Sequence, residues 1–337
     1  MPILLHLGST GPDVGRLEVR FAELGLYTGR IDNVFGGGVE AAVKSFQKSK
    51  GLSADGVVGD RTWSALFPGP VAAATSMPVA ISQLSGEPLV QRCLALTGTF
   101  ETTTGIPDCY AGISGDTDGQ GLSFGVAQWN IGQGTLQPLL AEMVAKHGDV
   151  MAGLFHDRLA ALQGMLASSL AAQLSWARSI QDPLRHRIFE PWLGLFQALG
   201  RTPQFQAIQV EHAAGIHAAA VQLCARFGVT TERAVALMFD IRVQNYSISA
   251  ATEAAIRADF GRIPSGAAPL DREVAMLRSI ANRRAEAAAA PYVEDVRTRK
   301  LTIANGTGTV HGVPYDLERQ FGIRLQALPL YLRGDML

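Results

Sequence analysis

Gly29-Arg-Ile-Asp-Asn-Val-Phe-Gly36 and Ala54-Asp-Gly-Val-Val-Gly59 are two similar glycine-bounded turns, and each stands directly before a segment with helical periodicity. Glycine and aspartate favour tight turns, and the similarity of the two units indicates an internal duplication. Around them, residues recur at helical spacing in three sets: Val14, Leu17, Phe21 and Leu24; Val39, Ala42, Val43 and Phe46; and Thr62, Trp63 and Leu66. We therefore predict a module of three short helices over residues 1–68, which together bury one small core.

This module resembles the peptidoglycan-binding domain-1 family. The resemblance rests on the segments Gly11-Pro-Asp-Val14, Gly25-Leu-Tyr-Thr-Gly29, Ile31-Asp32, Phe35-Gly36, Ala42-Val43 to Phe46-Gln47, Gly51-Leu52 and Asp55-Gly-Val-Val-Gly59 to Thr62-Trp63. Two residues depart from the family pattern, because Glu18 stands where Gln is usual and Val39 where Thr is usual. The resemblance implies affinity for the bacterial cell wall. The alternative is a generic three-helix unit without that affinity.

Residues 69–88 are rich in Pro, Ala and Ser without sustained periodicity, and we predict a linker there. Residues 89–337 are predicted to form one larger α-helical domain. Its amphipathic runs lie near 89–100, 136–146, 150–178, 204–227, 231–245 and 269–290. Near the end, Asn305-Gly306 stands between β-prone runs and predicts a small hairpin. The expected fold class is therefore mainly α.

The overall charge balance argues against nucleic acid as a partner. Lys and Arg total 29 against 30 for Asp and Glu, so no net field is available to hold a polyanionic backbone. No apolar stretch reaches the ~20 residues of a transmembrane helix, and we expect no membrane insertion. The three cysteines, Cys93, Cys109 and Cys224, are expected to be reduced core residues, with one Cys93–Cys109 bridge as the alternative. The expected protein is a monomer.

The first residues lack a basic region, and their apolar run stops at His6, so no secretory signal is predicted. His212 and His217 stand five residues apart on a predicted helix and do not share a face, so we expect no metal and no cofactor. Asp240, Gln244 and Asn245 form a polar helix face, which is interpreted as a solvated or buried structural network, with the far wall of a substrate cleft as the alternative. The basic residues Arg283-Arg284 and Arg297 to Lys300 are interpreted as solvated faces.

One stretch of the helical domain carries candidate chemistry, because residues 101–130 contain four carboxylates and six glycines. Glu101 falls where the apolar face of the 89–100 run ends, beside Phe100. A partly desolvated carboxyl of this kind can act as a general acid, because desolvation raises the pKa of a carboxylic acid. Glycosidic cleavage needs such an acid and a second carboxylate, for which Asp116 and Asp118 in the glycine-rich turn are available.

This arrangement resembles the lysozyme superfamily, in which a glutamate at a helix end precedes a glycine-rich β-hairpin. Asp118-Gly-Gln-Gly-Leu-Ser123-Phe-Gly-Val looks like the Asp-Gly-x-Gly-x-Thr-x-Gly segment of bacterial chitosanases. In that family the Asp is the general base, and Ser123 keeps the hydroxyl of the Thr that positions water. Phe124-Gly-Val-Ala-Gln-Trp-Asn130 looks like a segment of goose-type lysozymes, with Asn130 where those enzymes have Asp.

These resemblances imply roles for named residues. Glu101 is the expected general acid and Asp118 the expected base with Ser123, while Asp116 is a further candidate for the base. Gln128 and Asn130 are expected to bind sugar hydroxyl and N-acetyl groups, and Tyr110 and Trp129 to stack on sugar rings. The structural alternatives are a solvated helix end for Glu101, turn formation for the aspartates, and hairpin packing for the rest.

Together the two halves predict a modular muramidase that hydrolyses the β-1,4 bond between N-acetylmuramic acid and N-acetylglucosamine of peptidoglycan. Without a predicted signal peptide, it resembles phage endolysins released through holin-made holes, or effectors delivered by a dedicated secretion apparatus. The alternatives are a lytic transglycosylase, a chitosanase or chitinase, and a non-catalytic wall-binding structural protein.

Overall fold

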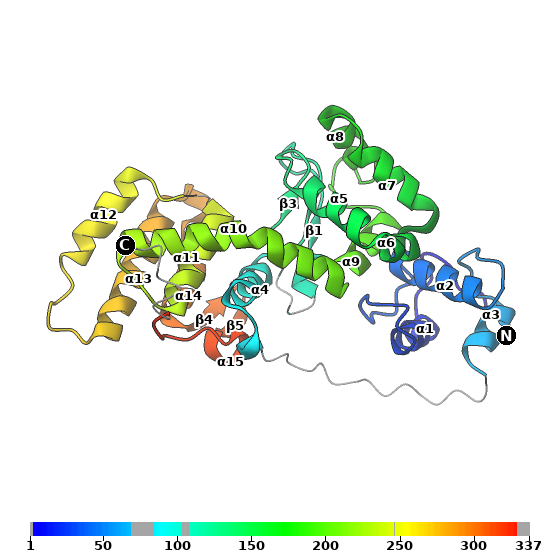
Figure 1. The fold of residues 1–337 in the computed structure, drawn as a ribbon, viewed down its shortest axis with the longest axis horizontal. Coiled ribbons are helices and arrows are strands. Elements are labelled where there is room, and N and C mark those ends of the chain that lie inside the picture. The colour runs from blue at the N-terminus through cyan, green and yellow to red at the C-terminus, as the bar shows by residue number, and fades with distance from the viewer. Residues whose placement is uncertain (1–2, 69–83, 103–104, 106–107, 246, 329–337) are drawn as a thin grey trace. The chain divides into compact units, whose positions relative to one another are not determined.

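A computed structural model describes residues 3–68, 84–102, 105, 108–245 and 247–328 of the chain (Figure 1). Helices dominate the described residues, and the strands form only two small antiparallel sheets. The predicted mainly α fold class is confirmed. Contacts divide the chain into two compact units, of which the first comprises Met1–Val79 and Tyr110–Gln209 and the second Ala80–Cys109 and Val210–Leu337.

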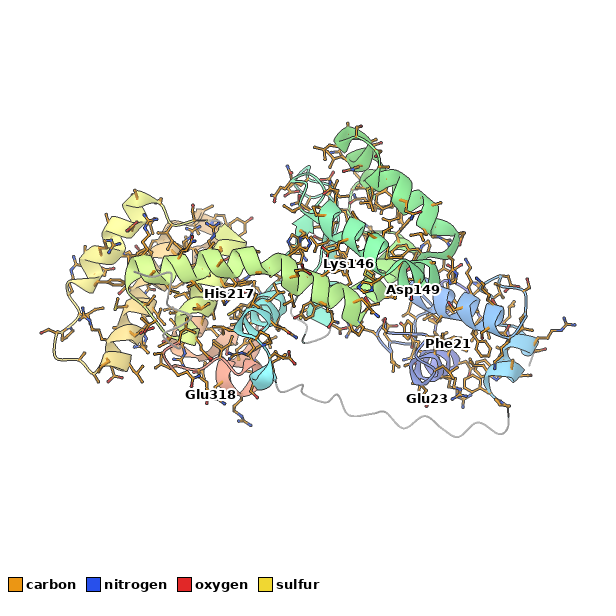
Figure 2. The ribbon with its side chains drawn as sticks, in the orientation of Figure 1. Phe21, Glu23, Lys146, Asp149, His217 and Glu318 are labelled. Carbon is orange, nitrogen blue, oxygen red and sulfur yellow. The ribbon has the colours of Figure 1, made fainter. Side chains whose placement is uncertain are left out.

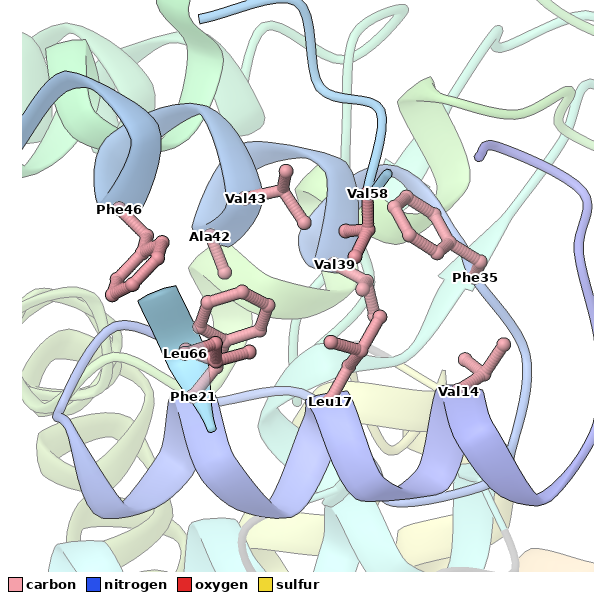
Figure 3. Packing of buried hydrophobic residues seen from close by; sticks show 10 residues of the cluster. All are labelled: Val14, Leu17, Phe21, Phe35, Val39, Ala42, Val43, Phe46, Val58 and Leu66. Carbon is pink, nitrogen blue, oxygen red and sulfur yellow. The ribbon is translucent and has the colours of Figure 1, made fainter. Parts of the chain in front are cut away.

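The N-terminal module has the three predicted helices, α1 (Pro12–Glu23), α2 (Gly37–Ser49) and α3 (Asp60–Leu66). Figure 3 shows the side chains that fill the space between them. This core consists of buried apolar residues from the helices and from the two turns: Val14, Leu17, Phe21, Phe35, Val39, Ala42, Val43, Phe46, Val58 and Leu66. Phe21 is fully buried, whereas Glu23 lies on the surface (Figure 2). Leu24 was expected in the core, but it follows the last residue of α1 and is 41% exposed.

Buried Gln47 explains why the second turn has its sequence. Its Nε2 donates to Asp55 Oδ1 at 2.9 Å and to the Val57 carbonyl at 2.9 Å, and its Oε1 accepts from the Gly56 amide at 3.0 Å. One amide on α2 thus satisfies three polar groups of the turn that leads into α3. Because buried polar groups are costly when unpaired, this bonding specifies the turn as well as stabilising it.

Within the first unit, α2 packs on α6 (Gly148–Phe155) and α9 (Trp192–Gly200). Glu190 Oε2 accepts from the Gly37 amide at 2.9 Å and from the Gly194 amide at 3.2 Å, which links the first turns of α2 and α9. His156 Nε2 lies 2.9 Å from the Ala41 carbonyl oxygen. The predicted linker covers 69–88, of which 69–83 lie outside the described residues and Leu84–Gly86 form the short helix η1. The predicted domain boundaries remain a prediction.

The rest of the first unit is a small sheet with helices around it. The sheet has the order β1 (Ile113–Ser114), β2 (Ser123–Phe124), β3 (Trp129–Asn130), with both pairs antiparallel. Phe124 of β2 stacks on Phe205 at 5.4 Å between ring centroids and meets Phe196 edge-on at 5.2 Å. The remaining helices are α5 (Leu136–Lys146), η2 (Asp108–Ala111), η3 (His156–Arg158), α7 (Leu159–Leu166) and α8 (Leu170–Ser179).

The second unit is built around α4 (Leu89–Thr102), α11 (Glu232–Asn245), α13 (Pro269–Glu286) and α14 (Val293–Asn305). Among the described elements, α13 packs most extensively on α14, and α11 packs on α4 and α14. The other elements are α10 (Pro203–Phe227), which begins in the first unit, α12 (Ala250–Phe260), η4 (Ala290–Tyr292), β4 (Thr307–Val310), β5 (Val313–Asp316) and α15 (Leu317–Phe321).

The amphipathic run near 150–178 is helical, as predicted, and consists of several short helices, because the chain turns at His156, with φ 47°, and again before Ser169 caps α8. One local prediction, the turn of the C-terminal hairpin, was wrong. The C-terminal hairpin exists, but its turn is at His311-Gly312. Asn305-Gly306 instead ends α14, where Gly306 takes the left-handed conformation that glycine adopts without steric cost. The three cysteines are buried and free, as expected.

Candidate functional site

Glu101 lies in the last turn of α4, in the second unit. The buried side of this helix includes Cys93, Leu94 and Phe100, which are at most 1% exposed. The next residue along, Glu101, keeps 29% of its side-chain surface exposed. Its Oε1 lies 2.7 Å from Nη1 of Arg299, and the Arg299 guanidinium also covers the Phe100 ring at 5.1 Å from the centroid. The carboxyl group is therefore held in one orientation by a cation that is itself packed on an aromatic ring.

A buried charge network holds Arg299 in place. Asp240 of α11 is fully buried, and its Oδ1 accepts from Arg299 Nη2 at 2.6 Å and from Thr97 Oγ1 at 3.2 Å. Lys300 is also fully buried, contacts Asp240 Oδ2 and donates to Gln244 Oε1 at 2.7 Å. Removing either partner of such a buried pair would leave an uncompensated buried charge, which is strongly destabilising.

The pKa values of Asp240, Lys300 and Arg299 show how strongly this network favours the charged form of each residue. Burial alone would raise the pKa of Asp240, but the charges of Arg299 and Lys300 lower it to about 2. Burial lowers the pKa of Lys300 to about 8, against the opposing attraction of Asp240. For Arg299, burial acts to lower the pKa, but Asp240 and Glu101 outweigh it and raise the pKa above its ordinary value. Asp240 and Arg299 are thus a stable ion pair, from which Arg299 reaches Glu101.

The expected structural network at Asp240 is present, but the expected solvated face at Arg297 to Lys300 is wrong for two residues. Arg299 is 2% exposed and Lys300 is fully buried. The signal in the sequence is the single carboxylate in Ala236-Leu-Met-Phe-Asp240-Ile, an otherwise apolar stretch whose buried charge requires a cationic partner. Nothing in that stretch says which of the 29 basic residues supplies it.

The two candidate aspartates of the first unit lie in the loop between β1 and β2, and they differ in their surroundings. Asp116 is 8% exposed, accepts from the Gly121 amide at 2.9 Å and pairs with Arg178 Nε at 2.7 Å. Burial would raise the pKa of Asp116, but these bonds outweigh it and lower the pKa. Asp118 is exposed, and its Oδ1 accepts from the Gln120 amide at 3.1 Å. Asp116 therefore holds the loop closed, while Asp118 presents its carboxylate to solvent.

Ser123 lies on β2, opposite Asn130 of β3, and is partly exposed. The turn between the strands requires glycine at 125, where φ is 84° and an added Cβ would lie 2.6 Å from Gln209 Oε1. The predicted glycine-rich hairpin is thus present, with a third strand. It brings Asp116, Asp118 and Ser123 onto one small scaffold, while Glu101 belongs to the other unit.

The expected substrate contacts of four residues find no support in their positions. Tyr110 and Trp129 are 2% and 8% exposed, so their rings pack inside the protein. Asn130 is buried, and its Oδ1 accepts from the Gln133 amide at 2.8 Å. Gln128 donates to the Gly125 carbonyl at 2.9 Å and accepts from Ser114 Oγ. Tyr110, Trp129 and Asn130 are buried, and Gln128 is partly exposed but bonded within the hairpin.

No group of three or more His, Cys, Asp or Glu residues is arranged to hold a metal ion in the described part of the chain. None of the described helices combines the length and the apolar character that crossing a membrane requires. Two carboxyl groups among these residues are available for chemistry: Glu101, which contacts Arg299, and Asp118, which is exposed in the glycine-rich loop.

Comparison with known proteins supports the interpretation of the N-terminal module. Residues 10–66 match the sequence family described as "Putative peptidoglycan binding domain", as the turn motifs predicted. The chain is 41% identical over 59 residues to a spore cortex-lytic enzyme of Bacillus cereus, which is 18% of this chain and 23% of the relative. It is 42% identical over 57 residues to the N-acetylmuramoyl-L-alanine amidase CwlM of Mycobacterium tuberculosis, or 17% of this chain and 14% of that relative. The matches thus span less than a quarter of these relatives.

Solved structures of chitosanases are similar over a larger part of the chain. One chitosanase complex matches 67% of this chain and 95% of its own, with 16% sequence identity and a TM-score of 0.42. The GH46 chitosanase of Gynuella sunshinyii in complex with chitotetraose matches 65% of this chain and 86% of its own, with 15% identity and a TM-score of 0.42.

Proposed function

We propose that this protein is a peptidoglycan hydrolase of the muramidase type, which cleaves the β-1,4 bond between N-acetylmuramic acid and N-acetylglucosamine. The N-terminal module keeps the enzyme on the wall, and Glu101 and Asp118 carry out the cleavage. The match of residues 10–66 supports peptidoglycan as the partner. The name of one relative specifies an amidase and the name of the other only a lytic enzyme, so the module supports peptidoglycan as the polymer and not a particular reaction.

The observation that carries the proposed reaction is the fixed Glu101 carboxyl. Arg299 engages Oε1 at 2.7 Å, and we assign Oε2 as the atom that carries the proton to the leaving glycosidic oxygen. A general acid must meet that oxygen at hydrogen-bond distance, and a carboxyl held by a packed guanidinium loses little freedom when it does so.

Asp118 is the proposed base, with Ser123 as the residue that positions the attacking water. Its exposure supports this role, since a base that activates water must be reached by water. Asp116 is less suited, because Arg178 and the Gly121 amide already occupy both of its oxygens. No cofactor or metal takes part in the proposed reaction, and the proposed enzyme acts as a monomer.

Glu101→Gln in the full chain tests the proposal. The variant keeps the size of the side chain but cannot donate a proton, so release of reducing ends from purified sacculi is expected to fall by about 10²–10⁴. Co-sedimentation with sacculi should be unchanged, because the wall-binding module is intact. Activity within a few-fold of the parent would show that Glu101 is not the general acid.

Mass spectrometry of the released fragments separates the competing reactions. Reducing N-acetylmuramic acid ends are expected from a muramidase. Anhydro-sugars would identify a lytic transglycosylase, and preferential cleavage of purified glucosamine polymers a chitosanase or chitinase. Binding without any release would identify a structural wall protein.

A further inference from the structure

A pocket of the second unit lies where the end of α11 meets the connection between α13 and α14. Its lining includes Gln244 of α11, Arg284 of α13, the three alanines at 287–289, Tyr292 of η4 and Asp295 of α14. The alanines make one wall small and apolar. Tyr292 is 63% exposed and offers an aromatic surface at the opening. The polar groups that remain are an amide, a guanidinium and a carboxylate.

The pocket lies at the C-terminal end of α11. Glu101 lies at the C-terminal end of α4, which packs beside α11. Arg92 of α4 pairs with Glu232 of α11 at 2.9 Å, and Thr97 of α4 bonds to Asp240 of α11 at 3.2 Å. Because these pairs follow the same order along both chains, the two helices run in the same direction. Glu101 and Gln244 therefore both lie near the C-terminal ends of this helix pair. Gln244 also joins the Asp240 network through its bond from Lys300.

Arg284 is the cation of this pocket, and it lacks a partner. Its Nε is buried without any hydrogen-bond partner, and no described carboxylate forms an ion pair with it. The nearby acids are engaged elsewhere, because Asp295 Oδ1 lies 2.6 Å from His311 Nε2 and Glu286 Oε2 lies 2.8 Å from Arg283 Nη1. Burial lowers the pKa of Arg284, which is the cost of holding a guanidinium in this position. An uncompensated guanidinium beside an aromatic ring is suited to a planar anion.

We propose that this pocket binds a carboxylate carried by the wall glycan close to the cleaved bond, with Arg284 as the receptor and Tyr292 packing on the adjoining part of the substrate. This inference rests on the proposed function and names the feature of the substrate that is recognised. Peptidoglycan carries carboxylates on N-acetylmuramic acid, either on the free lactyl group or on the attached stem peptide. Chitin and chitosan carry none, so the pocket separates a muramidase from a chitosan-cleaving enzyme.

Binding to the full-length Glu101→Gln chain tests the pocket without cleavage of the ligand. The probes are peptide-free glycan strands, which expose the lactyl carboxylate, strands with intact stem peptides, and oligomers of N-acetylglucosamine, which have no carboxylate. Adding Arg284→Gln should weaken binding of at least one carboxylate-bearing strand by about tenfold or more and leave the N-acetylglucosamine oligomer unchanged. The strand that responds identifies whether the lactyl group or the peptide supplies the carboxylate. Arg284→Lys should restore part of the affinity because it keeps the charge.

Arg278→Gln is the matched control, since Arg278 is an exposed arginine of the same helix that bonds to Asn305 Oδ1. It should change none of the three affinities. Two results would overturn the proposal. The first is that adding Arg284→Gln to the Glu101→Gln chain changes the affinity for no strand, and the second is that it lowers the affinity for all three ligands equally.

A second measurement leaves Arg284 unchanged, so it tests the pocket even if the Arg284→Gln variant does not fold. A disaccharide and a tetrapeptide-bearing disaccharide from the wall are titrated beside their methyl esters, again with the Glu101→Gln chain. Weaker binding of one ester by about tenfold is expected, and equal binding of acids and esters would contradict the inference. Release of reducing ends from sacculi by the wild-type chain tests the proposed function separately.

Discussion

Glu18 is a buried acid in the wall-binding module. It is fully buried, and its Oε2 accepts from the Asn33 amide at 2.9 Å, while its Oε1 is buried without a partner among the described residues. Burial raises the pKa of Glu18 from 4.5 to about 7, and the charge of Asp32 adds to this against the hydrogen bond from Asn33. An acid whose pKa is raised by folding binds more protons in the folded state than in the unfolded state. The module therefore loses stability as the pH rises from about 4.5 to about 7.

Glu18→Gln, which introduces the residue usual in the resembling family, should remove this pH dependence. At pH 8 the variant is expected to be more stable than the parent by on the order of 1–3 kcal/mol, because Gln has no charge to bury. At pH 4 the two should be alike. Denaturant unfolding of residues 1–68, followed through the fluorescence of Trp63, measures the difference. A parent whose stability does not change between pH 4 and pH 8 would contradict the assignment.

Asp240→Asn should destabilise the second unit. The change leaves Arg299 and Lys300 buried without their shared anion, and losses of about 3–5 kcal/mol are typical when one partner of a buried pair is removed. Chemical denaturation of the full chain measures the loss, with Asp118→Asn as the control because Asp118 is exposed. An equal stability of the two variants would show that the network contributes no more than a surface contact.

Among the elements, the β1–β2 loop carries two aspartates with different contacts, one buried and one exposed. Asp116 ties the loop to α8 through Arg178 and to the Gly121 amide, and Asp118 extends from the same loop into solvent. A rigid loop that carries one free carboxylate holds that group at a constant position. The expected effects of substitution therefore differ in kind.

Asp118→Asn should abolish hydrolysis and leave both stability and wall binding unchanged, because it removes a base while the Asn side-chain oxygen can still accept the hydrogen bond from the Gln120 amide. Asp116→Asn should retain more activity, but it should lower the melting temperature through the loss of its ion pair. Reducing-end release and thermal unfolding, measured side by side, distinguish the two. A more severe loss of activity from Asp116→Asn would reverse the assignment, and an unchanged activity of Asp118→Asn would favour a lytic transglycosylase.

The proposed reaction of the complete protein has a stereochemical consequence, because a base that activates water inverts the anomeric centre and a carboxylate nucleophile leads to retention. A base that acts through water requires a separation of about 6.5–9.5 Å between the carboxyl groups, whereas a nucleophile requires about 5–5.5 Å. With Asp118 as the base, the product formed first should be the inverted α-anomer. Rapid NMR of the reaction on purified glycan strands checks this. A β-anomer formed first would assign a nucleophile in place of the base.

The module, its turns and the place of Glu101 at a helix end could be predicted, because they depend on residues close together in the chain. Turn formers such as Asp55 and Gly56, and apolar residues at helical spacing such as Val39 and Val43, act locally and can be identified locally. The short helices between 148 and 179 and the turn at His311-Gly312 depend on competition between neighbouring elements, which periodicity does not resolve. Residue types alone also failed to separate the bound Asp116 from the exposed Asp118.

The pairing of the buried charges, in contrast, could be learned only from the folded protein. Arg299 stands 59 residues from Asp240, and Arg178 stands 62 from Asp116, distances over which no sequence pattern relates an anion to its cation. The net energy of such a pair is the Coulomb attraction in the folded protein minus the cost of removing both charges from water. Neither contribution exists in the extended chain. For the same reason Arg284 resembles any surface arginine in the sequence, and its unpaired guanidinium becomes visible only in the pocket that α11, α13 and α14 build around it.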